Sequence, residues 1–252
     1  ISPVLEAART WAQRCLVEDG SILGGGELWT SENLALLDRY FVQRPDAGSG
    51  DFFEKLSGQL ADAPPAVPRL MAELLWALFL FPSNIGAGKK REGIARAWAF
   101  SGAPLDLGHP LLSDAVLAGV GSAGTAFNTL RWHELTYAVP LFTALKRRDP
   151  AERAGLVSDY ERLSPWLESI PRDGDRQFRH MLRFLLCPDR VERMSSNGDR
   201  RRVLNAFDIA SQREMKRWSD RQFDDALLNL RRKLAAQHGT EDLDFYLPPL
   251  VD

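Results

Sequence analysis

The chain of 252 residues lacks the features typical of secreted, zinc-binding or membrane-spanning proteins. Two cysteines, Cys15 and Cys187, are too few for a disulfide framework, and no CxxC pair suggests a zinc site. The longest apolar run, Leu74 to Phe81, has eight residues, whereas a helix that spans a bilayer needs about 20. The first residues show no signal peptide and no initiator Met. We therefore expect a cytoplasmic globular protein without membrane contact, cut from a longer polypeptide.

Strand patterns are also missing, because no run of four or more alternating β-branched residues occurs. Helical periodicity dominates instead. Asp51 with Glu54, and Ser219 with Gln222, have the spacing of capping boxes ahead of apolar residues at helical intervals. The apolar run that ends at Pro82 is typical of a buried core helix. The sequence therefore predicts an all-α, multi-helix globular bundle with irregular Gly- and Pro-rich loops and little or no sheet.

The charge is distributed unevenly, although the whole chain carries a formal charge of only −2. The segment from Arg172 to Lys233 holds 16 of the 32 Lys and Arg residues but only 10 of the 34 Asp and Glu residues. This segment is therefore basic, and the rest of the chain is acidic. We predict three parts: a helical N-terminal subdomain (1–80), a helical middle region with a Gly-rich loop (81–171), and a basic helical C-terminal region (172–252).

The basic segment supplies the candidate binding site. Its first four arginines are spaced 4, 3 and 4 residues apart, which predicts a row along one helical face. Guanidinium groups in a row suit DNA phosphates, whose contacts need no base specificity. The predicted nucleic-acid-binding residues are Arg172, Arg176, Arg179, Arg183, Arg200, Arg201 and Arg202. The alternative is a solvated face whose charges pair with neighbouring carboxylates such as Asp173 and Asp199.

Motifs for catalysis, cofactors and metals are incomplete. Residues 119–124 read GVGSAG and match the letters of GxGxxG, but the strand and βαβ unit that this motif requires are not predicted. Residues 86–90, GAGKK, lack both ends of a P-loop. His133-Glu134 begins an HExxH zinc motif, yet Tyr137 stands at the position of the second histidine. We therefore predict no catalytic residue, no cofactor and no metal site in this chain.

The seven tryptophans are interpreted by their position in the helical pattern. Trp76 and Trp132 lie in apolar helical stretches, so we predict both to be core residues. Trp166 and Trp218 lie near predicted helix ends and are the candidates for exposure. An exposed ring of this kind would be able to stack against a nucleobase.

Two stretches carry longer patterns. The first contains FPSNIG at 81–86, Trp98, HPLL at 109–112 and GVGSAGTAFNTLRWHEL at 119–135. The second contains RHMLRFLLCPDRVERMSS at 179–196, DRRRV at 199–203 and LDFY at 243–246. Together they resemble the region that precedes the motor in McrB-type AAA+ ATPases, the motors of modification-dependent restriction systems. The resemblance covers residues 81–246, and residues 1–80 share only a helical, apolar character.

This resemblance implies a non-catalytic specificity or regulatory module of a McrB-like AAA+ NTPase in restriction-type defence. Its expected partners are DNA, the AAA+ motor of the same polypeptide and a nuclease subunit. Nucleotide and Mg²⁺ would belong to the motor, whose Walker motifs this chain lacks.

Two other hypotheses remain open from the residues. The chain is alternatively a protein-interaction module that docks on the AAA+ ring or on a nuclease or effector subunit without DNA contact. Exposed apolar residues beside the basic face would favour this reading. A third hypothesis is an enzyme with a ligand loop at Gly119–Gly124, which a pocket lined by Asn128 and Arg131 would favour.

Overall fold

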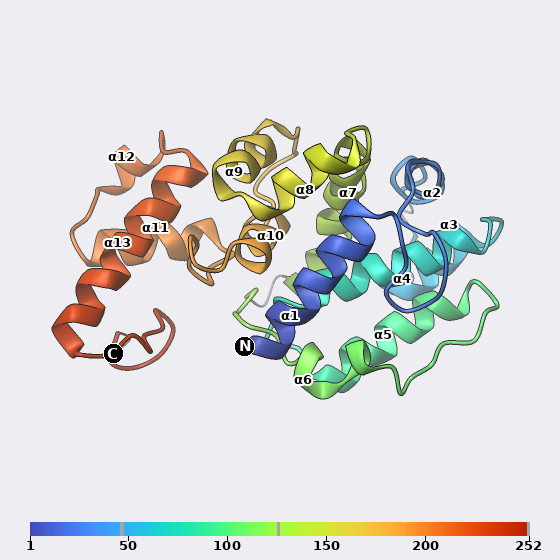
Figure 1. The fold of residues 1–252 in the computed structure, drawn as a ribbon, viewed down its shortest axis with the longest axis horizontal. Helices are drawn as coiled ribbons and strands as arrows, with labels where there is room; N and C mark the ends of the chain where they lie inside the picture. The colour runs from blue at the N-terminus through green and yellow to red at the C-terminus, as the bar shows by residue number, and fades with distance from the viewer. Residues whose placement is uncertain (46–47, 125–126, 251–252) are drawn as a thin grey trace.

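The computed structural model describes residues 1–45, 48–124 and 127–250, except for the side chain of Asn128. Within these residues the chain forms thirteen α-helices and no sheet, so the all-α prediction is confirmed (Figure 1). The helices are α1 (Ser2–Trp11), α2 (Ser31–Leu37), α3 (Phe52–Leu60), α4 (Ala66–Phe79), α5 (Ala87–Ala99), α6 (Asp114–Leu117), α7 (Phe127–Lys146), α8 (Pro150–Ser158), α9 (Tyr160–Ser169), α10 (Phe178–Leu186), α11 (Asn197–Ala206), α12 (Gln212–Met215) and α13 (Asp220–His238). Two π-helical turns, η1 (Ala12–Val17) and η2 (Asp38–Val42), follow α1 and α2, and a 3₁₀ turn, η3 (Pro110–Leu112), precedes α6. Among the described residues, no helix combines the length and apolar character needed to cross a bilayer.

The predicted helix starts form as expected. Asp51 accepts hydrogen bonds from the backbone N–H of Phe53 and Glu54, and the Glu54 carboxylate accepts one from the Asp51 N–H. Ser219 and Gln222 make the same reciprocal pair at the start of α13. Each pair satisfies backbone donors that the first turn of a helix leaves without partners. Both capping boxes are therefore confirmed.

Helix α4 is the central core helix, as its apolar sequence predicts. Its residues from Leu70 to Phe79 are at most 1% exposed, and they include the acidic residue Glu73. The Glu73 carboxylate accepts hydrogen bonds from Ser21 Oγ at 2.5 Å and Trp29 Nε1 at 2.7 Å, and from the backbone N–H of Ile22 and Leu23. Burial raises the pKa of Glu73, and these donors oppose that rise. One buried carboxylate thus fixes the loop before α2 on the core.

The apolar residues form two separate clusters. The larger cluster runs from Val4 to Val191 and the smaller one from Met194 to Phe245. In Figure 1, α11, α12 and α13 lie together at one end of the molecule, with α9 and α10 between them and the N-terminal helices. The predicted boundaries at residues 80 and 171 both fall inside the larger cluster. The larger cluster ends at Val191 and the smaller one begins at Met194.

The Gly-rich segment at 119–124 packs against the loop after α4. Ser83 donates its backbone N–H to the Gly121 carbonyl oxygen at 2.8 Å, and Val120 donates to the Phe81 carbonyl oxygen at 2.8 Å. Gly119 has φ +82°, and a Cβ there would lie 2.4 Å from the Pro82 carbonyl oxygen. These glycines therefore allow two backbones to approach closely.

Candidate binding cleft

The predicted row of arginines does not form. Helix α10 begins only at Phe178, so Arg172 and Arg176 lie in the loop before it. Arg179 and Arg183 are on the helix, but they are 2% and 0% exposed because they face carboxylates of α13. The expectation of one exposed basic face along these four residues is therefore wrong.

Three of the predicted arginines belong instead to a buried polar group between the two apolar clusters. We call it the arginine cluster; it consists of Arg179, Arg183, Arg200, His180, Asp220 and Asp224, each at most 6% exposed. Asp220 accepts hydrogen bonds from Arg179 and, at 2.7 Å, from Arg183 Nη2. Asp224 accepts from Arg200 and, at 2.8 Å, from the hydroxyl of Tyr160 on α9. Each buried guanidinium thus pairs with a carboxylate of α13, and Arg179 pairs in addition with Asp175 at 3.3 Å. These bonds connect α9, α10, α11 and α13.

His180 lies inside this cluster as a neutral ring. Its Nδ1 lies 3.1 Å from Arg183 Nη1 and 3.0 Å from Arg200 Nη1. Guanidinium nitrogens only donate, so Nδ1 must be the acceptor and the ring proton is assigned to Nε2. Complete burial, together with the positive charges of Arg200, Arg179 and Arg183, holds the pKa of His180 well below its usual value. The cluster is a structural joint, and its three arginines do not face solvent.

The other four predicted arginines reach the surface to different degrees. Arg202 pairs with Asp199 at 2.9 Å with its side chain 78% exposed. The guanidinium carbon of Arg201 lies 5.9 Å from the centroid of the Phe223 ring. Arg172 is exposed and Arg176 half-buried, and neither makes an ion pair within the part of the chain that the structure describes. Arg201 is also half-buried and makes no ion pair among the described residues, but of the predicted arginines only Arg172 and Arg176 line one of the two pockets.

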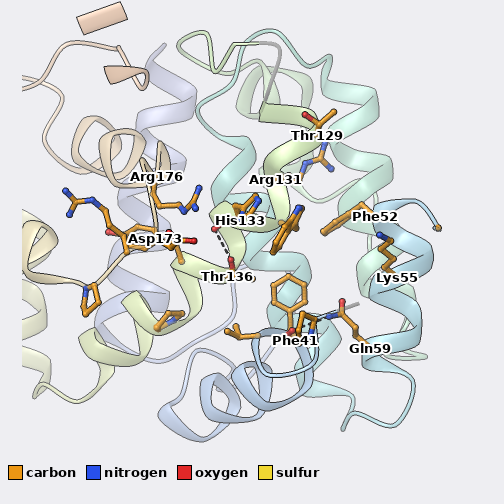
Figure 2. A pocket seen from close by; sticks show the side chains of 18 residues that line it. Phe41, Phe52, Lys55, Gln59, Thr129, Arg131, His133, Thr136, Asp173 and Arg176 are labelled. Atoms are coloured by element: carbon orange, nitrogen blue, oxygen red, sulfur yellow. Dashed lines mark hydrogen bonds between the residues drawn. The ribbon is translucent and has the colours of Figure 1, made fainter. Parts of the chain in front are cut away.

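Arg172 and Arg176 line a cleft of about 780 Å³ between α3, α7 and the loop before α10 (Figure 2). This volume falls in the range of pockets that hold small organic ligands, roughly 300–1,000 Å³. The close-up shows Arg176 and Asp173 on one side of His133 and Phe52, Lys55 and Gln59 on the other. The cleft is lined by Phe41, Val42, Pro45, Gly50, Phe52, Lys55, Gln59, Thr129, Arg131, Trp132, His133, Thr136, Tyr137, Pro140, Pro171, Arg172, Asp173 and Arg176.

The cleft is basic. Arg172, Arg176, Lys55 and Arg131 carry positive charges, and Asp173 is the single carboxylate among the lining residues that the structure describes. The Arg131 guanidinium lies 4.9 Å from the Phe79 ring centroid and 5.6 Å from that of Phe52, and burial lowers its pKa. Excess positive charge in a concave site attracts anions.

Aromatic residues accompany this charge. Trp132, predicted to be a core residue, is 44% exposed, so that prediction is wrong. Helical spacing does place Trp132 on the same face of α7 as Leu135 and Val139, which are fully buried. At the position of Trp132, however, this face borders the cleft and is not covered by packed side chains. Its indole stacks on the His133 ring with centroids 3.5 Å apart and planes inclined by 28°. The cleft therefore presents an aromatic surface of fixed orientation.

Two further side chains add polar character. Burial and the neighbouring Arg176 lower the pKa of His133, while Asp173 opposes this, so the ring is neutral at pH 7. Tyr137 is 4% exposed and burial raises its pKa. Its hydroxyl is buried and has no hydrogen-bond partner among the described residues.

The other predicted tryptophans have the following positions. Trp76 is fully buried, as predicted, and Trp166 is 9% exposed. Trp218 is half-buried and packs edge-on against Phe223, with ring centroids 5.3 Å apart. Neither of the two candidates for exposure therefore offers an open ring.

The ligand loop proposed at Gly119–Gly124 gains no support from the pockets. A second pocket of about 560 Å³ at the start of α5 is lined by Asn84, Lys89, Arg131 and four apolar or glycine residues. Neither of the two pockets includes residues 119–124. Asn128 lies outside the described side chains. Over 1–45, 48–124 and 127–250, no three His, Cys, Asp or Glu residues are grouped so as to hold a metal ion.

No family model, curated protein or solved structure matches this chain. The interpretation of the cleft therefore depends on its geometry alone. Sequence reasoning found Arg172 and Arg176 but missed Lys55, Phe52 and Trp132. No local signal joins residues that are 40 to 120 positions apart in the chain; only the tertiary structure places α3, the start of α7 and the 171–176 loop around one cleft.

Proposed function

We propose that this protein is a non-catalytic recognition module that binds nucleic acid in the cleft described above. Arg172 and Arg176 contact phosphate groups, and Lys55 adds positive charge on the opposite wall. The observation that carries this proposal is the presence in one open cleft of an exposed tryptophan together with Arg172 and Arg176, which make no ion pair among the described residues. Phosphate contacts and aromatic stacking are the two components of sequence-tolerant nucleic-acid binding.

The proposal retains the class of protein that the sequence resemblance implies and assigns the binding site to fewer residues than the sequence predicts. As the sequence resemblance implies, the module would serve specificity or regulation in a McrB-like AAA+ NTPase of a restriction-type defence system. Nucleotide hydrolysis and DNA cleavage would belong to the motor and to a nuclease subunit. Within this chain, the phosphate-binding residues are reduced from seven arginines to Arg172 and Arg176. The three arginines of the arginine cluster are excluded because they are buried and paired with carboxylates.

A second candidate function is docking of a protein partner, such as the AAA+ ring or a nuclease subunit. Leu130 and Trp132, at the start of α7, are 45% and 44% exposed beside the basic cleft. Exposed large apolar residues are typical of the centre of a protein interface. The proposed test therefore has to separate phosphate binding from protein docking.

The test is fluorescence anisotropy of labelled single-stranded, duplex and methylated DNA over a salt series. We expect micromolar or tighter binding that weakens steeply as salt rises, because each phosphate contact releases counterions. The double substitution Arg172→Glu and Arg176→Glu should weaken binding roughly tenfold or more and should reduce the slope of log Kd against log salt by roughly 1.5.

The matched control reverses two charges elsewhere. Lys216 and Arg217 follow α12, are exposed and make no ion pair within the described residues. The substitutions Lys216→Glu and Arg217→Glu change the net charge equally and should leave most of the affinity intact. Equal losses in both double variants, or no DNA binding at about 50 mM salt, would contradict the proposed site and favour protein docking.

A further inference from the structure

The cleft also indicates which form of nucleic acid it accepts. Trp132 is the exposed aromatic residue of the lining, and His133 supports one face of its indole at 3.5 Å. In a duplex the faces of the bases are covered by their neighbours, and only base edges are accessible in the grooves. The face of an indole is therefore complementary to a base that is not stacked within a duplex.

Charge and volume agree with a ligand of this kind. The basic residues Arg172 and Arg176 line the same cleft as Trp132, so a phosphate and its own base can be contacted together. A volume of about 780 Å³ suits a ligand the size of one or two nucleotides rather than a rod-like duplex. Tyr137 supplies a buried hydroxyl whose donor has no partner among the described residues.

We propose that the cleft binds unpaired nucleotides of a single strand, with a base stacked on Trp132 and the adjoining phosphate held by Arg172 and Arg176. This inference rests on the proposed function and specifies its substrate. The support of the indole by His133 fixes the stacking surface before the ligand arrives, which reduces the entropy lost on binding. Since any base has a face that can stack, the cleft selects unpaired over paired nucleotides without strong preference for sequence.

The experiment compares a short labelled single strand with its duplex and with the same strand carrying abasic sites. Wild-type protein should bind the single strand at least about tenfold more tightly than either of the other two, because stacking on one aromatic side chain commonly contributes this much. Trp132→Ala should weaken binding of the single strand about 5- to 150-fold, and Trp132→Phe should retain most of the affinity. Binding of the abasic strand should be the same for wild type and Trp132→Ala.

Leu130→Ala is the matched control, because Leu130 is equally exposed on the same helix but does not line the cleft. It should leave all affinities unchanged. Circular dichroism should show that each variant keeps its helical content.

The outcomes separate this inference from the proposed function. If Arg172→Glu with Arg176→Glu abolishes binding but Trp132→Ala and the abasic strand have no effect, phosphate binding stands and the stacking assignment is overturned. Tighter binding of the duplex than of the single strand overturns it as well. If a free mononucleotide displaces the strand at micromolar concentration, the ligand is the nucleotide itself and the assignment to a strand is overturned. If the arginine double variant binds like wild type, the proposed function fails.

Discussion

Arginines only a few residues apart in the sequence have opposite physical roles in this protein. Arg179 and Arg183, on α10, are buried and pair with Asp220, whereas Arg172 and Arg176, in the loop before it, make no ion pair among the described residues. The difference does not arise from residue type or local spacing. It arises because α13 brings two carboxylates to α10 from about 40 positions further along the chain. A basic stretch is therefore a binding surface only where the fold leaves its charges uncompensated.

The same comparison separates stability from binding. Breaking a buried ion pair leaves a charge without solvent or partner, so the arginine cluster should dominate the free energy of unfolding. Exposed cations contribute little to stability but attract anions over a longer range. Substitutions in the two groups should therefore affect different measurements.

The largest expected effect comes from Asp220→Ala. This change removes the carboxylate that Arg179 and Arg183 share. Arg179 then keeps only Asp175, and Arg183 keeps only the longer contacts with Glu168 at 3.9 Å and Asp224 at 4.0 Å. We expect the free energy of unfolding to fall by about 3–5 kcal/mol, measured by urea denaturation. Asp173→Ala, an exposed carboxylate of the cleft, is the control and should change it by less than about 0.5 kcal/mol. Equal denaturation midpoints for Asp220→Ala and wild type would contradict a structural role of the cluster.

The next effect is a dependence of stability on pH that arises from His180. The pKa of His180 is depressed in the folded protein, so below about pH 6.5 the unfolded chain binds a proton that the folded ring does not. The free energy of unfolding should therefore fall as pH falls, with a contribution of at most about 1.4 kcal/mol per pH unit. His180→Asn keeps an oxygen that can accept from Arg183 and Arg200 but cannot titrate.

The measurement is the difference between wild type and His180→Asn in urea denaturation from about pH 7 to pH 5. Buried carboxylates such as Glu73 and Glu134, whose pKa values are raised, titrate in both proteins and cancel in this difference. A difference that stays constant over this range would mean that His180 takes up a proton as readily in the folded protein as in the unfolded chain, contrary to the acceptor role of its Nδ1.

The smallest effects on stability should come from the accessible arginines. Arg202→Ala removes an exposed pair with Asp199, and Arg172→Ala removes no ion pair within the described residues. Each should change the free energy of unfolding by less than about 0.5 kcal/mol in the same denaturation assay. Of the two, only Arg172→Ala should weaken DNA binding. A loss of 2 kcal/mol or more for Arg172→Ala would place this residue in the packing rather than at the ligand.

Much of the fold could be predicted because its signals are local. The capping boxes at Asp51 and Ser219 involve residues three positions apart, and both form as predicted. The core position of α4 follows from its uniform apolar composition, although Glu73 shows that a fully buried carboxylate can be part of such a helix. The candidate site was predicted less well. Two of seven arginines line the cleft, and its tryptophan was assigned to the core.

The sequence by itself determined the all-α class, the starts of key helices and the central apolar helix, since each depends on residues within one or two turns of one another. Only the tertiary structure decided which charges are available. Arg183 is paired because Asp220 packs against it, whereas Arg176 makes no ion pair with any carboxylate of the described chain. It also decided that Trp132 borders a cleft, although Leu135 on the same helical face is fully buried. Helical periodicity specifies the face of a helix, whereas burial and electrostatic compensation depend on what distant segments place against that face.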